Sequence, residues 1–188
     1  MAKLSRSLAK LEAEKSKRKG VKKKPGAAIV VADAVSKGAE LFHTPGKDPF
    51  GTFTVDGHLE TYPIRSRFVH MLLRYECWRR KQPATRQVIG EAVDNLEARA
   101  IFEGPEDEVY LRVAEYDGAI YLDLCDTEWR QIEVASKGWS VLSTEESPVR
   151  FRRAAGMLPL PEPERGGSID DLRGVINITD ADWPLFLC

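Results

Sequence analysis

The sequence has few cysteines and no long apolar run. Its three cysteines, Cys77, Cys125 and Cys188, are odd in number and form no Cys-x-x-Cys motif, which predicts reduced thiols rather than disulfides or a zinc site. The longest apolar run, residues 27–32, is far too short to span a bilayer, and the N-terminus lacks the apolar core of a signal peptide. These absences predict a soluble, cytoplasmic protein that does not contact membranes.

The motifs that usually hold phosphates, metals or a catalytic nucleophile are also missing. Gly46-Lys47-Asp48 has leucine five residues before the glycine and no Ser or Thr after the lysine, so it is not a phosphate-binding loop. Neither Gly-x-Gly-x-x-Gly nor Gly-x-Ser-x-Gly occurs. His43, His58 and His70 match no metal-ligand spacing. We therefore expect no cofactor, no metal, no ATP hydrolysis and no enzymatic activity.

The charge is unevenly distributed, although the chain carries a net charge of only −1. Residues 1–24 contain ten Lys or Arg and two Glu, a net +8, whereas the remainder contains 18 basic and 27 acidic residues, a net −9. A basic arm on an acidic body is typical of an electrostatic tether, and the alternative is a solvated tail. As a tether it would bind nucleic acid without sequence preference, through Lys17, Arg18, Lys19, Lys22, Lys23 and Lys24.

Apolar periodicity predicts three helices after this arm, over residues 27–39, 66–81 and 85–101. Ser66 and Thr85 are suitable N-caps for the second and third helices. The expected buried face of the second helix is Phe68, Met71, Leu72 and Tyr75. That of the third helix is Val88, Ile89, Ala92, Val93, Leu96 and Ala100.

The second and third helices have the spacing of a helix-turn-helix, which leaves a DNA-reading role open. The third helix is nevertheless acidic, because it carries Glu91, Asp94 and Glu97 against Arg86 and Arg99. A net acidic helix fits poorly into a major groove. The pair is therefore better interpreted as an αα packing unit.

Two hairpins are predicted from Asp-Gly turns, at Asp56-Gly57 and Asp117-Gly118. Counting outward from the second turn places Val113 opposite Leu122, Leu111 opposite Leu124 and Arg112 opposite Asp123. We expect the leucines and the valine to form the buried face, and Arg112 and Asp123 to form a charge pair on the other face.

Further strands are predicted over residues 129–134 and 139–142, and a fifth strand around Val149 and Phe151. Prolines 159, 161 and 163 then require an extended segment, which we interpret as a strap across the sheet. A short capped helix is expected over residues 169–173. Arg150, Arg152 and Arg153 follow or alternate with the fifth strand and, with Arg65 and Arg67, are further candidates for phosphate contact.

The predicted fold is thus α+β: a helical unit plus an antiparallel β-sheet closed by a Pro-rich strap, with a basic N-terminal arm. The expected division of the chain is an arm and linker (1–26), a small hairpin plus helical unit (27–104), the sheet and strap (105–165), and the start of a further domain (166–188).

The order and spacing of several segments resemble a region of phage and mobile-element primase–helicase proteins, over roughly residues 39–183. The matching segments are residues 40–45, 57–66, 96–100, 111–114, 120–124, 129–130, 138–139, 148–153, 156–161 and 166–168. In such proteins this region lies directly before a superfamily 3-like helicase ATPase. The resemblance implies a non-catalytic pre-helicase module that binds nucleic acid or a helicase partner.

The resemblance ends where the related proteins continue into their ATPase, so we expect a truncated form or a stand-alone module. Two alternatives remain at this point. One is a decayed fragment without activity. The other is an enzyme with an unrecognised site, for which Asp123 and Asp126 are the only nearby carboxylate pair.

Overall fold

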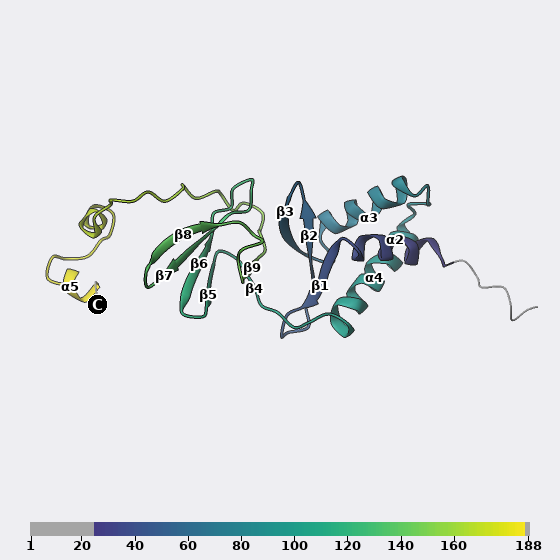
Figure 1. The fold of residues 1–188 in the computed structure, drawn as a ribbon, viewed down its shortest axis with the longest axis horizontal. Helices are drawn as coiled ribbons and strands as arrows, with labels where there is room; N and C mark the ends of the chain where they lie inside the picture. The colour runs from purple at the N-terminus through teal and green to yellow at the C-terminus, as the bar shows by residue number, and fades with distance from the viewer. Residues whose placement is uncertain (1–24, 187–188) are drawn as a thin grey trace, which may run out of the picture.

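The computed structural model describes residues 25–186, and side chains as far as residue 184. It confirms an α+β fold, with helices at one end of an elongated molecule and a second sheet beyond them (Figure 1). We refer to residues 27–102 as the helical lobe and residues 109–151 as the sheet lobe. In chain order the helical lobe contains α2 (Ala27–Ser36), β1 (Ala39–His43), β2 (Pro49–Val55), β3 (His58–Pro63), α3 (Arg67–Arg79) and α4 (Arg86–Phe102).

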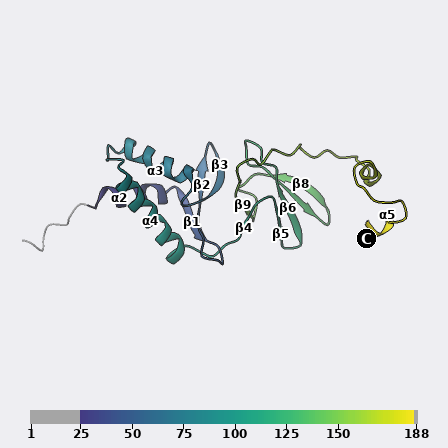
Figure 2. The ribbon, with the colours of Figure 1, turned by 180° about the vertical axis from the view of Figure 1, so that it is seen from behind.

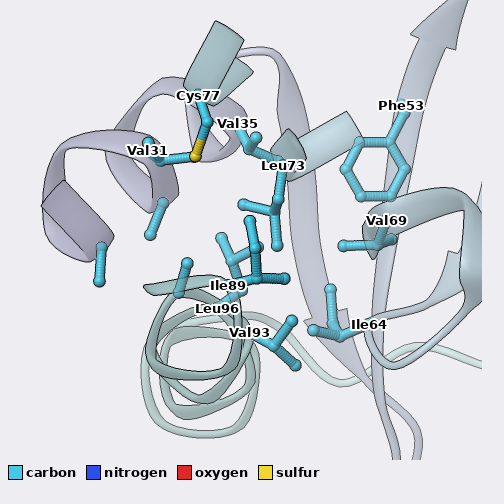
Figure 3. Packing of buried hydrophobic residues seen from close by; sticks show 13 residues of the cluster. Val31, Val35, Phe53, Ile64, Val69, Leu73, Cys77, Ile89, Val93 and Leu96 are labelled. Atoms are coloured by element: carbon cyan, nitrogen blue, oxygen red, sulfur yellow. The ribbon is translucent and has the colours of Figure 1, made fainter. Parts of the chain in front are cut away.

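The three strands of the helical lobe form an antiparallel sheet in the order β1-β2-β3, with the helices packed against one face. The core between them is fully apolar, and Figure 3 shows Val31 and Cys77 pointing toward Leu73, Ile89 and Leu96. These side chains are at most 3% exposed. This core holds α3 and α4 in fixed positions on the sheet.

Local signals in the helical lobe are confirmed. The Ser66 hydroxyl accepts a hydrogen bond from the Val69 amide at 3.3 Å, and Thr85 accepts one from Val88 at 3.2 Å, so both helices begin at the predicted caps. All the residues predicted to line the inner face of α4 are buried or packed against the core. The β2–β3 hairpin turns at Asp56-Gly57, where both φ angles are positive.

The predicted buried face of α3 is wrong. The helix buries Val69, Leu73, Glu76 and Cys77, whereas Met71 and Tyr75 are 55% and 54% exposed. Phe68 and Leu72 only border the core. Two stripes of α3 have helical spacing, and the true inner stripe contains a glutamate, so apolar counting selected the wrong one. The correction leaves aromatic side chains on the outer surface of the lobe.

The sheet lobe contains a four-stranded antiparallel sheet in the order β5-β6-β7-β8 and a two-stranded parallel sheet of β4 and β9. Their bounds are β4 (Val109–Tyr110), β5 (Val113–Tyr116), β6 (Ala119–Asp123), β7 (Gln131–Ala135), β8 (Gly138–Leu142) and β9 (Arg150–Phe151). The predicted strand around Val149 and Phe151 therefore exists, but it joins β4 in parallel instead of extending the antiparallel sheet.

The predicted register of the β5–β6 hairpin is confirmed, but its predicted buried face is wrong. Val113 pairs with Leu122 around an Asp117-Gly118 turn whose φ angles are both positive. Of the predicted face, Leu124 is buried at 1% exposed, but Val113 is 53% exposed and Leu111 45% exposed, while Tyr121 and Asp123 on the opposite face are buried. That face packs on Val149, Phe151 and Tyr110, because β9 crosses beneath it. The buried face of this hairpin is therefore set by the elements that pack on it in the tertiary fold, and not by the apolar alternation of its strands.

Beyond β9 the chain runs extended past the sheet lobe before it leaves this lobe, as Figure 2 shows from behind. It contacts the sheet lobe where the Leu160 amide donates to the Leu124 carbonyl at 2.8 Å and Arg112 donates to the Leu158 carbonyl at 3.0 Å. Two short elements follow, the 3-10 helix η1 (Ile169–Gly174), capped by Ser168, and α5 (Trp183–Phe186). No helix within residues 25–186 has both the length and the apolar character needed to cross a membrane.

Candidate nucleic-acid interface

The arginines of the β9 region were predicted to contact phosphates, but two of them, Arg150 and Arg153, are partly buried and bound to carboxylates of the protein itself. Arg150 binds Glu40 at 2.9 Å, Asp107 at 2.6 Å and the Thr52 hydroxyl at 2.7 Å. Its guanidinium also lies 4.6 Å from the centre of the Phe42 ring. These contacts join the helical lobe to the sheet lobe and use most of its donors, so the geometry favours a structural role for Arg150.

Arg153 is held even more closely. Its guanidinium donates two hydrogen bonds to the Asp123 carboxylate, of 2.8 and 3.0 Å, and lies 4.0 Å from the centre of the Trp129 ring. Asp123 is only 1% exposed. The centre of the Tyr62 ring, on β3, lies 5.9 Å from the centre of the Trp129 ring. Arg112 lies opposite Asp123 as predicted, since the Asp123 amide donates to the Arg112 carbonyl at 3.0 Å. The predicted charge pair between them is wrong, because the Arg112 side chain donates to the backbone carbonyl of Asp123, at 3.3 Å, and the Asp123 carboxylate binds Arg153.

Asp126, the second carboxylate of the alternative enzymatic interpretation, is also neutralised by arginine. Burial alone would raise the pKa of Asp126, but hydrogen bonds and charge from Arg130 outweigh it and lower the pKa. The Arg130 Nε lies 2.6 Å from the carboxylate. Both carboxylates therefore stabilise the loop that presents Trp129. Residues 25–184 contain no cluster of three or more His, Cys, Asp or Glu side chains that could hold a metal ion.

Arg152 alone of the three has no ion pair within the part of the chain that the structure describes, and it is half-buried beside Arg65 and Glu97. Arg65 itself is held at 2.9 Å by Asp94 and at 2.5 Å by Glu97. The six predicted phosphate ligands of the arm, Lys17, Arg18, Lys19, Lys22, Lys23 and Lys24, lie outside the described residues.

A different surface, on the outer side of α3, combines positive charge with exposed aromatic rings. Residues 65–86 contain seven basic residues and one acidic residue, a net +6, although residues 25–188 as a whole carry −9. All seven basic side chains are exposed: Arg65, Arg67, Arg74, Arg79, Arg80, Lys81 and Arg86. We call these exposed basic residues, together with the exposed rings of Tyr75 and Trp78, the α3 face.

The two aromatic rings of the α3 face are stacked on each other and exposed to solvent. Trp78 is 74% exposed and Tyr75 is 54% exposed, and their ring centres are 5.8 Å apart at an angle of 26°. The Arg79 guanidinium lies 5.9 Å from the centre of the Tyr75 ring. Trp78, Arg79, Lys81 and Gln82 line a shallow hollow at the end of the helix. Stacked rings bordered by cations are suited to binding planar, anionic ligands.

Glu76 orients the cations at this end of α3. Its carboxylate, 9% exposed, binds Arg79 at 2.7 Å and Arg80 at 3.0 Å. The guanidiniums thereby stay close to the helix while their remaining N–H groups point to solvent. One carboxylate shared by two arginines leaves the pair with a net positive charge. Lys81 adds a further exposed charge at a position of positive φ, directly after the helix.

The C-terminal end of α3 lies at the same end of the helical lobe as the start of α2, in both views (Figures 1 and 2). The sequence signal for this surface is the run Arg74-Tyr75-Glu76-Cys77-Trp78-Arg79-Arg80-Lys81, in which basic residues flank two aromatic residues. The predicted buried face of α3 includes Tyr75, so the sequence pattern alone does not indicate an exposed aromatic site. Comparison of the chain with protein-family models, curated protein sequences and solved structures found no match.

Proposed function

We propose that this chain is a non-catalytic nucleic-acid-binding module that acts beside a helicase ATPase in the replication of a mobile element. The observation that carries the binding role is the α3 face, a basic surface with exposed aromatic rings on an otherwise acidic protein. Because residues 65–86 carry +6 against the overall −9, an approaching phosphate backbone is attracted to this surface and repelled by most of the remainder.

The basic arm supports the same role. It adds a net +8 to the chain, and the described chain begins at the same end of the helical lobe as the α3–α4 turn. The arm contains no aromatic residue, so it contacts phosphates by charge and supplies affinity without sequence preference. In this proposal Arg150 and Arg153 are structural, while Arg152 remains available to a ligand.

The placement beside a helicase rests on the resemblance of residues 39–183 to the region that precedes the ATPase of primase–helicase proteins. A module of this kind holds the nucleic acid while a partner performs the chemistry. The partner in this proposal is a helicase or ATPase subunit, and no catalytic residue is assigned to this chain.

A salt titration with an arm variant tests the charge-based part of the proposal. The variant replaces Lys17, Arg18, Lys19, Lys22, Lys23 and Lys24 by glutamine in the full-length chain. If about six arm cations contact phosphates, the logarithm of duplex affinity falls against the logarithm of salt concentration with a slope of about −5. The variant is expected to lose most duplex binding and to show a clearly shallower slope, set by the four basic residues left in the arm and by the α3 face. Fluorescence anisotropy with a labelled duplex of arbitrary sequence measures both quantities.

The matched control replaces Lys37 and Lys137, two exposed lysines outside the arm and the α3 face, by glutamine. Each substitution is expected to change duplex affinity by less than twofold, because neither lysine belongs to the arm or to the α3 face. A wild-type protein that binds no nucleic acid at low salt would refute the proposed function. An arm variant with undiminished affinity and slope would move the phosphate contacts away from the arm.

A further inference from the structure

We propose that Tyr75 and Trp78 form a base-stacking platform that makes this module prefer single-stranded nucleic acid to duplex. This inference rests on the proposed nucleic-acid binding and adds the class of ligand. It assigns a separate task to each part of the surface. The arm supplies charge to any nucleic acid, and the two rings bind bases whose faces are free.

The exposure of the two rings is the first reason. Burial of a large aromatic side chain removes roughly 150–250 Å² of its surface from water, so such side chains usually lie in the core of a stable fold. Trp78 lies 74% exposed, and neither Trp78 nor Tyr75 belongs to the apolar core, to which α3 contributes Val69, Leu73 and Cys77. The two rings therefore have apolar area that a ligand can cover.

The spacing of the rings is the second reason. Residues three apart on an α-helix lie on the same side of it and are separated by about 4.5 Å along its axis. The two rings are stacked, inclined by only 26° with their centres 5.8 Å apart, so the pair presents an exposed aromatic outer surface on which the stack can continue. A planar base can lie on this surface, and stacking tolerates any base because every base has a π face.

The cations around the rings favour a nucleic acid over other occupants. Arg79 and Lys81 border the hollow beside Trp78, and Arg74 and Arg86 are exposed nearby in sequence. Tryptophan and arginine also occur in protein interfaces, but the surrounding charge is positive over the whole of residues 65–86. A polyanion with exposed bases satisfies both the charge and the rings. In a duplex the base faces are stacked on each other, so the rings gain nothing.

Two variants of the full-length chain test the platform against a matched control. Trp78→Ala removes the larger ring, and Trp78→Phe retains a ring at the same place. The control is Met71→Ala, which removes a side chain of similar exposure from the same helix but cannot affect stacking. The probes are a fluorescein-labelled oligothymidylate and a labelled duplex of equal length, measured by anisotropy at one salt concentration. Thermal unfolding confirms that each variant is folded.

Trp78→Ala is expected to lower affinity for the oligothymidylate roughly 5- to 150-fold, the range for losing one stacked base, with duplex affinity changed less than twofold. Trp78→Phe should keep most of the single-strand affinity, and Met71→Ala should change neither affinity appreciably. Equal losses on both probes, or no loss on either, would overturn the platform while leaving nucleic-acid binding intact. Wild-type protein that binds neither probe would overturn the proposed function itself. A loss of single-strand affinity on Met71→Ala equal to that on Trp78→Ala would assign the effect to the helix and refute stacking.

Discussion

Replacing Arg153 by alanine is expected to destabilise the protein by about 3–5 kcal/mol, because it leaves the Asp123 carboxylate buried without a counter-charge. Asp123 is 1% exposed, and Arg153 supplies two of its hydrogen bonds. The substitution also removes the cation that lies 4.0 Å over the Trp129 ring. Urea unfolding followed by circular dichroism measures the loss of free energy.

The penalty for Arg153→Ala is expected to fall when Asp123 is replaced as well. In the double variant with Asp123→Asn no uncompensated charge remains, so the double variant should be more stable than Arg153→Ala alone. Arg152→Ala is the matched control, because the neighbouring Arg152 has no ion pair among residues 25–186, and it should change stability by less than about 0.5 kcal/mol. Equal losses for Arg152→Ala and Arg153→Ala would show that the buried pair is not what stabilises the loop.

Replacing Gly104 by alanine is expected to destabilise the protein by about 1–3 kcal/mol, through crowding. A Cβ atom at this position would lie 2.6 Å from the backbone oxygens of Ala100 and Leu41 and 2.9 Å from the Cα of Phe42. Gly104 is where the chain leaves α4 and passes against β1, and backbone atoms cannot move away as a flexible side chain can. The same urea measurement applies.

Gly90 provides the opposite case within the same helix. A Cβ atom added at Gly90 meets nothing within 4 Å, and the residue lies in the interior of α4. Gly90→Ala is therefore expected to stabilise the protein by about 0.5–1 kcal/mol, because alanine loses less backbone entropy in a helix. If Gly104→Ala also stabilised the protein, this result would contradict the close approach of β1 to the end of α4.

Features set by short-range chemistry could be predicted from the sequence. Asp-Gly turns require positive φ at both positions, and both hairpins turn where such a pair occurs. Ser66 and Thr85 cap helices because their hydroxyls accept the free amides of the first turn. The register of β5 against β6 followed from the turn alone. The α+β class follows from these elements.

Features that depend on which surfaces meet could not be predicted in the same way. α3 has two possible inner stripes, and only its packing on α2 and α4 shows that Leu73 and Cys77 are inside. The β5–β6 hairpin has an apolar and a mixed face, yet the mixed face is buried because β9 brings Phe151 to it. The charge of Asp123 on that face is tolerated since Arg153 arrives from a distant part of the chain.

The candidate site was affected by both kinds of error. Charge alone marks the arginines near β9 as candidates, but Arg153 binds the buried Asp123 carboxylate, and Arg150 binds the more exposed carboxylates of Glu40 and Asp107 between the lobes. The basic residues of α3 were visible in the sequence, and their importance depended on the rotation of the helix. Once Tyr75 and Trp78 are outside, the same charges form a surface with a specific chemistry. Arm and α3 face together account for the proposed binding.

The most direct test of the α3 face is the tryptophan indole N–H region of a ¹H–¹⁵N correlation spectrum, recorded as oligothymidylate is added. The chain has four tryptophans, so the four indole signals can be assigned with single Trp→Phe variants. The account predicts that the indole signal of Trp78 shifts or broadens on binding, while that of Trp129, which is 8% exposed beneath Arg153, stays in place. A Trp78 signal that does not move while the oligothymidylate is bound would contradict the account.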